Sequence, residues 1–154
     1  MRFPRLSLCL SPFIAGAFLL VSQAANALEY KAVGANPAIL YDAPSAKGKK
    51  LFIAPRGMPV EIVLSYGEWA KVRDASGGLA WVEAKALVAK RNVVVQVANA
   101  KVRANADDGG FINFTADKGV LLELQSDQAV NGWLKVKHKD GQTGFVKATE
   151  VWGE

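Results

Sequence analysis

The chain has 154 residues, a net charge of +5 and one cysteine, and its length alone suggests one domain. Arg2, Arg5 and Cys9 lie in the first 27 residues, so the remainder has 17 basic against 14 acidic residues and no thiol. A net charge of +3 argues against nucleic-acid binding, and the lack of thiols excludes a disulfide framework.

Residues 1–27 have the features of a secretory signal peptide. Arg2 and Arg5 form a positive n-region, residues 13–21 form an apolar core, and residues 25–27 match an A-x-A cleavage site. The core is far shorter than the roughly 20 residues that span a bilayer. We therefore expect cleavage after Ala27, no membrane span in the mature protein, and a periplasmic or secreted product.

The rest of the chain divides into two similar units, and the first of them is predicted to be all-β. Residues 28–36 show no clear periodicity and are assigned as a lead-in, so the first domain is assigned to residues 37–89. Short apolar runs alternate with turn residues, and no helix-length period occurs. Strands are predicted near residues 39–42, 51–54, 59–66, 70–74 and 79–83. In the third strand Val60, Ile62 and Leu64 alternate with other residues, which places these three in the core.

The second unit, residues 90–154, repeats this order. Its strands are predicted near residues 101–104, 111–116, 120–126, 134–138 and 143–147. Gly57 corresponds to Gly119, and two additional residues at 128–131 are expected to lie in a loop. Residues 88–96 contain neither Gly nor Pro, so a strand is expected there rather than a flexible tether. Because units of this size are marginally stable alone, we expect them to pack against each other.

The clearest part of the repeat is a hairpin that occurs twice, at residues 67–83 and at residues 131–147. Each copy has a tryptophan, an apolar-patterned run, a turn ending in Gly, and a second run. Gly77 and Gly141 suit the left-handed position that follows a type I turn. Such a turn places Lys71 opposite Trp81 and Lys135 opposite Phe145.

The same register gives each hairpin an inward and an outward face. The predicted inward residues are Ala70, Val72, Ala80 and Val82 in the first copy, and Leu134, Val136, Gly144 and Val146 in the second. The predicted outward residues are aromatic and basic: Trp69, Lys71, Arg73 and Trp81, and then Trp133, Lys135, Lys137 and Phe145. This stripe is either a binding face or a set of lysine stems that cover exposed rings, with cation–π pairing of about 0.5–1 kcal/mol. In the second unit we favour the second alternative, in which the lysine stems cover exposed rings.

These residues resemble the bacterial SH3-like (SH3b) family of exported proteins. The family pattern is a V-R-like strand, a Gly before a V-x-V strand, then W-x-K-V and G-x-x-G-W-V. It is carried here by Val102-Arg103, by Gly57 with residues 60–62, by residues 69–72 and by residues 141–146. The resemblance covers residues 37–89 and again residues 92–152.

The resemblance implies an all-β protein with two tandem SH3-like small β-barrels of five or six strands, no cofactor and no catalytic residues. It also implies a non-catalytic binding module for cell-envelope material, either peptidoglycan or a peptide. The candidate ligand-binding residues are Tyr66, Trp69, Lys71, Arg73 and Trp81, with Trp133, Lys135 and Phe145 as weaker candidates in the second unit. Since Tyr66 has no aromatic counterpart there and Trp81 becomes Phe145, we expect the first unit to hold the site. We expect a monomer.

The residue inventory argues against catalysis and metal binding. The mature chain has no Cys and a single histidine, His138, which we expect to be a solvated hairpin residue. No His or Cys cluster suggests a metal site. Two other functions stay open: an assembly factor that pairs with an envelope protein through the stripe or through residues 93–97, and a cell-wall hydrolase or a regulator of one.

Overall fold

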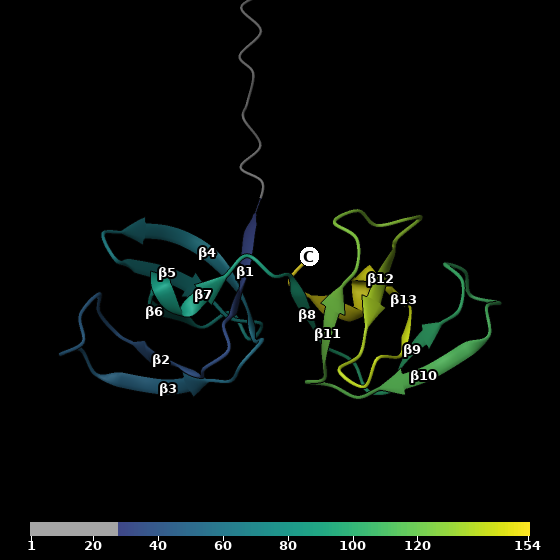
Figure 1. The fold of residues 1–154 in the computed structure, drawn as a ribbon, viewed down its shortest axis with the longest axis horizontal. Coiled ribbons are helices and arrows are strands. Elements are labelled where there is room, and N and C mark those ends of the chain that lie inside the picture. Colours follow the sequence, from purple (N-terminus) through teal and green to yellow (C-terminus); the bar gives the residue numbers. More distant parts are fainter. Residues whose placement is uncertain (1–27) are drawn as a thin grey trace, which may run out of the picture.

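The structure is a computed structural model that describes residues 28–154, and the predicted signal peptide at residues 1–27 lies outside this range. It consists of two antiparallel sheets of seven strands that lie side by side, with β1 and β8 at the centre (Figure 1). Two 3-10 helices of three residues complete the regular structure. Within the described part of the chain, no helix is long and apolar enough to cross a membrane.

Both sheets have the same topology. The first contains β1 (Glu29–Val33), β2 (Ala38–Tyr41), β3 (Lys50–Ala54), β4 (Pro59–Tyr66), β5 (Trp69–Arg73), β6 (Leu79–Glu83), η1 (Ala84–Ala86) and β7 (Leu87–Val88). The second contains β8 (Asn92–Val95), β9 (Ala100–Arg103), β10 (Ile112–Ala116), β11 (Leu121–Leu124), β12 (Trp133–Lys137), β13 (Thr143–Lys147), η2 (Ala148–Glu150) and β14 (Val151–Trp152). The strand order is β3-β2-β6-β5-β4-β1-β7 in the first and β10-β9-β13-β12-β11-β8-β14 in the second, so the chain is a structural duplication.

The predicted all-β duplication is confirmed, with differences at the start of the chain and in sheet closure. All ten predicted strands are present, and the strand expected within residues 88–96 is β8. The lead-in assigned to residues 28–36 is wrong, because it contains β1, which pairs with both β4 and β7. Each sheet is open, since its two end strands do not pair with each other, so neither unit is a closed barrel. Each unit has seven strands rather than five or six, because β1 and β7 in the first unit and β14 in the second add to the predicted strands.

A β-bulge in β4 overturns part of the predicted core. Ile62 pairs with Val72, but the next pair is Leu64 with Lys71, so Val63 is an extra residue. A bulge changes the face to which the following side chains point. Val60 is therefore buried and Ile62 partly buried as predicted, whereas Leu64 is 43% exposed on the outer face.

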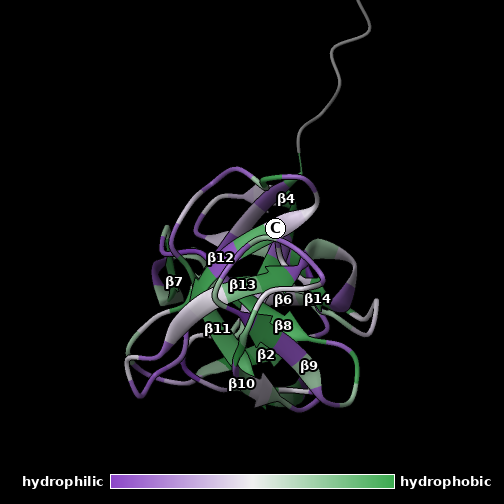
Figure 2. Ribbon diagram, turned by 90° about the vertical axis from the view of Figure 1, so that its right-hand side faces the viewer, coloured by the Kyte–Doolittle hydropathy of each residue, from purple (hydrophilic) through white to green (hydrophobic). Residues whose placement is uncertain are grey.

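The repeated hairpin has the predicted register in both copies. Lys71 pairs with Trp81 and Lys135 with Phe145. Gly77 and Gly141 have φ of 88° and 93°, and each donates its N–H to the carbonyl three residues earlier, at 2.9 Å. The eight residues predicted to point inward are all buried. All of them except Gly144 belong to two separate apolar clusters, one in each unit. Hydrophobic stretches lie mainly in the strands at the middle of the view, and the surrounding loops are mostly hydrophilic (Figure 2).

The two units pack against each other through a hydrogen bond from a side chain to the backbone and a few side-chain contacts. Asn92 at the start of β8 donates its Nδ2 proton to the carbonyl oxygen of Gly57 at 2.8 Å. Tyr30 and Trp152 form an edge-to-face pair with centroids 5.2 Å apart, and the Arg91 guanidinium lies 6.0 Å from the Tyr30 ring. Burial of Tyr30 and the nearby carboxylate of Glu61 raise the pKa of its phenol. These contacts confirm the expected packing.

One inward position differs between the units in a way that can be tested. Ala80 is accommodated in β6, but a Cβ at the equivalent Gly144 would lie 2.6 Å from the Arg103 carbonyl oxygen and 2.7 Å from Val102 Cγ1. Since overpacking a core costs about 1–3 kcal/mol, Gly144→Ala should lower the free energy of unfolding by that amount, measured by urea denaturation. Gly109→Ala, whose Cβ would meet only the exposed Asp107 side chain at 3.3 Å, is the matched control and should be close to neutral. Equal stability of the two variants would contradict the tight contact between β9 and β13.

Candidate ligand-binding face

Backbone pairing brings the predicted aromatic and basic residues of the first unit onto one face. Across the sheet, Tyr41 pairs with Trp81, Trp81 with Lys71, and Lys71 with Leu64. Residues that are directly paired in a sheet point to the same side, so these side chains form a row on the side of the sheet that faces away from the core. Trp69 lies two residues along β5 from Lys71 and pairs with Tyr66. We call Tyr41, Tyr66, Trp69, Lys71 and Trp81 the aromatic face.

Two edge-to-face pairs hold the rings of the aromatic face. The Tyr41 and Trp69 centroids are 5.4 Å apart with an interplanar angle of 87°, and those of Tyr66 and Trp81 are 6.5 Å apart at 74°. Lys71 Nζ lies 5.9 Å from the Trp81 centroid. Such pairs contribute about 0.5–1.5 kcal/mol beyond the burial of area, so the rings are positioned before any ligand arrives. Tyr66 is 67% exposed, and Trp69 and Trp81 are half-buried.

Tyr41 was not among the residues predicted from the sequence, although it supports the face. Its ring is buried against Trp69, and β6 lies between the strands that carry the two rings. The sequence signal was weak because Leu40 and Tyr41 are adjacent apolar residues at a bulge, where simple alternation fails. Leu64 was likewise missed and adds an exposed apolar side chain to the row.

Arg73, a predicted ligand-binding residue, is engaged within the fold. Its Nη1 donates to both carboxylate oxygens of Glu61, at 2.9 and 2.8 Å, and Glu61 is only 7% exposed. A buried carboxylate without its partner is strongly unfavourable, so the primary role of Arg73 is to neutralise Glu61. Arg73 therefore borders the aromatic face and stabilises it.

The equivalent face of the second unit is covered. Trp133, predicted to point outward, is only 6% exposed, because Lys147 Nζ lies 5.4 Å from its ring centroid and pairs with Asp108 at 2.6 Å. The hydrogen bond from Lys147 lowers the pKa of Asp108. Lys135 is exposed, and Phe145 is half-buried beside Arg103. A polar hollow of about 230 Å³ adjoins Trp133 and Lys147. The first unit has Glu83 at the position of Lys147, paired with Trp69 in register, and within residues 28–154 no lysine or arginine lies over the Trp69 ring.

The remaining titratable chemistry is sparse. Within residues 28–154, no group of three or more His, Cys, Asp or Glu side chains could hold a metal ion. His138 is less solvated than expected: its side chain is mostly buried, its ring centroid lies 5.9 Å from that of Phe114, and Nδ1 is 3.1 Å from an Asp140 oxygen.

Comparison with known proteins identifies a family for the chain and several solved structures with limited similarity to it. No curated protein matches the chain. Two structures with similar folds are NlpC1 and NlpC2 from Trichomonas vaginalis, at 13% and 11% identity and a TM-score of 0.39 each; the match covers 94% and 83% of this chain but 52% and 49% of theirs. A third is an NlpC/P60 endopeptidase from Photobacterium damselae subsp. piscicida, at 15% identity and a TM-score of 0.35, covering 81% of this chain and 33% of that one. The chain thus spans about half or less of the length of these proteins.

The family assignment agrees with the duplication seen in the strand order. A model of the bacterial SH3 domain matches residues 34–88 and again residues 90–153, once in each unit. The chain therefore belongs to the bacterial SH3 domain family and carries two tandem copies of that domain.

Proposed function

We propose that the protein is a non-catalytic binding module of the cell envelope, which acts as a monomer and binds peptidoglycan or a peptide on the aromatic face. The observation that carries this proposal is the difference between the two units. In the second unit Lys147, which is paired with Asp108, covers Trp133, whereas in the first unit the equivalent Trp69 has no such cover and pairs with Tyr66, which is 67% exposed. A duplicated fold needs no exposed, preassembled rings for stability, so their retention in one copy favours ligand binding.

The side chains of the aromatic face suit a ligand that has both apolar surfaces and negative charge. Aromatic rings that are already fixed lose little conformational freedom on binding. Tyr66, Trp69 and Trp81 offer ring surfaces to sugar or aliphatic groups, and Lys71 offers a cation to a carboxylate. Peptidoglycan combines sugar rings with short peptides that carry carboxylates. The signal peptide predicted at residues 1–27 supports an envelope location, periplasmic or secreted.

Substitutions on the aromatic face should abolish retention on the cell wall. The Trp69→Ala/Trp81→Ala double variant should lose at least tenfold in affinity for purified peptidoglycan in a sedimentation assay, because central aromatic contacts typically contribute more than about 1 kcal/mol each. Tyr66→Ala should weaken binding with little effect on folding, since its ring is mostly exposed. Phe111→Ala removes an exposed ring in the second unit and is the matched control.

Equal retention of the wild type and the double variant would reject this site. Failure of the wild type to sediment would remove peptidoglycan as the ligand and leave a peptide. Clearing of cell wall in a zymogram by the purified protein would overturn the non-catalytic assignment.

A second candidate function is that of an assembly factor, and the edge strand β3 favours it. Residues 93–97 were predicted as a surface for strand pairing, but β8 lies between β11 and β14 and both Val93 and Val95 are buried, which excludes this route. By contrast, β3 ends the first sheet and exposes Leu51, Phe52 and Ile53, the last by 68%. An edge strand with apolar side chains can accept a strand from another protein.

Crosslinking in cells separates the two candidate functions. If β3 holds a partner, Ile53→Lys should remove one recurrent crosslinked protein, because a charge would be buried on the paired edge, while Trp69→Ala/Trp81→Ala should leave it unchanged. A crosslinking pattern that is the same for wild type and Ile53→Lys would reject assembly through β3.

A further inference from the structure

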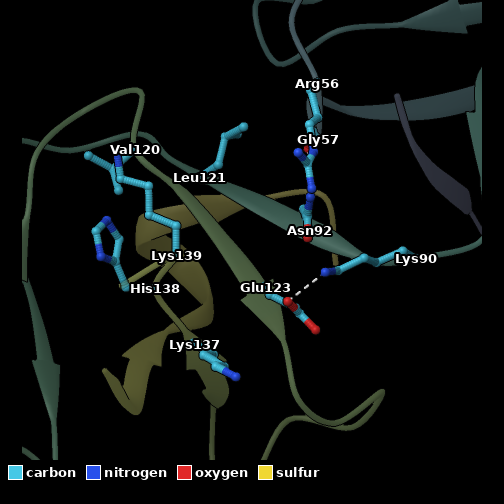
Figure 3. Close-up of a pocket in the computed structure, with 10 residues that line it drawn as sticks. All are labelled: Arg56, Gly57, Lys90, Asn92, Val120, Leu121, Glu123, Lys137, His138 and Lys139. Atoms are coloured by element: carbon cyan, nitrogen blue, oxygen red, sulfur yellow. Dashed lines mark hydrogen bonds and ion pairs between the residues drawn. The ribbon is translucent and has the colours of Figure 1, made fainter. Parts of the chain in front are cut away.

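A cleft between the two units is lined by more positive than negative side chains. It has a volume of about 660 Å³ and lies between the first unit at Arg56 and Gly57 and the second unit at β11 and the end of β12 (Figure 3). Four cationic side chains line it: Arg56, Lys90, Lys137 and Lys139. Glu123 is the single carboxylate in the lining.

The charges of the cleft are only partly compensated. Lys90 Nζ pairs with Glu123 at 2.6 Å, and this hydrogen bond, together with the charge of Lys137, lowers the pKa of Glu123. Within residues 28–154, Arg56, Lys137 and Lys139 form no ion pair within 4 Å. The cleft therefore carries a net charge of +3, which equals the balance of 17 basic and 14 acidic residues over the whole mature chain. The rest of residues 28–154 is thus electrically balanced.

The contact between the units sets the shape of this cleft. Asn92 Nδ2 donates to the Gly57 carbonyl at 2.8 Å, and a Cβ at Gly57 would lie only 2.9 Å from that nitrogen. The two units can approach this closely because residue 57 has no side chain, and its φ of 79° also favours glycine. Val120 and Leu121 add apolar surface to the lining. A volume of this size lies in the usual range of small-molecule sites, about 300–1,000 Å³.

We propose that this cleft is a second binding site, separate from the aromatic face, for a ligand with two or more carboxylate or phosphate groups. Cations from both units would contact it: Arg56 from the first, and Lys137 and Lys139 from the second. The Arg56 guanidinium can bind an oxyanion through two parallel N–H groups, while the lysines act as mobile point charges. Such a ligand would bridge the two units.

Calorimetric titration of mature protein, residues 28–154, with pyrophosphate and with citrate tests the proposal. Both probes carry several oxyanion charges, and we expect saturable binding of at least one in low-salt buffer. Tighter binding of pyrophosphate would identify phosphate as the preferred group, and tighter binding of citrate would identify carboxylate. Lys137→Gln/Lys139→Gln should weaken binding about tenfold, whereas Lys47→Gln/Lys50→Gln, the same change outside the cleft, should alter it less than about twofold.

Glu123→Gln is a control that should change the affinity for the probe in the opposite direction. It removes the only carboxylate of the lining and frees Lys90, so it should tighten binding about threefold, which a folding defect would not do. The proposal is overturned if neither probe binds saturably, if the two lysine double variants lose affinity equally, or if Glu123→Gln weakens binding.

Discussion

The turn that closes each repeated hairpin is the constraint on which the rest of the structure depends. Its left-handed glycine, Gly77 or Gly141, fixes which residues of the two strands are paired. Since side chains alternate across a strand, this register sends four residues per hairpin into the core and leaves the tryptophan, lysine and aromatic positions outside. The core and the candidate ligand-binding face are therefore two results of one backbone geometry. A change in the register of the hairpin would alter the core and the candidate ligand-binding face together.

The duplication also explains how the two small units are joined. Gly57 and Gly119 donate their N–H to the carbonyl oxygens of Val33 and Val95, the same bond in each unit. In the first unit Gly57 additionally accepts from Asn92, so one copy of a repeated turn joins the units. The open aromatic face and the basic cleft therefore use different parts of the repeat: one its outer sheet surface, the other the junction created by the tandem arrangement.

Features set by local pattern were predictable from the sequence, and features set by distant residues were not. The hairpin register and the inward residues followed from the turn chemistry at Gly77. Leu64 was assigned to the wrong face because the bulge at Val63 has no signature in a run of apolar residues. Trp133 was expected to be exposed because the residue that pairs with its covering Lys147, Asp108, lies outside the hairpin. The cleft was not predicted, since its cations come from three separate stretches that only the folded chain brings together.

The indole N–H resonances of the four tryptophans offer the most direct test of the claim that the first unit binds the ligand. Trp69 and Trp81 lie on the aromatic face, Trp133 under Lys147, and Trp152 at the contact between units, so one spectrum reports on the candidate site and on two internal controls. On titration with soluble peptidoglycan fragments, the Trp69 and Trp81 signals should shift while those of Trp133 and Trp152 stay in place. Shifts of Trp133 with Trp69 and Trp81 unchanged would contradict this claim.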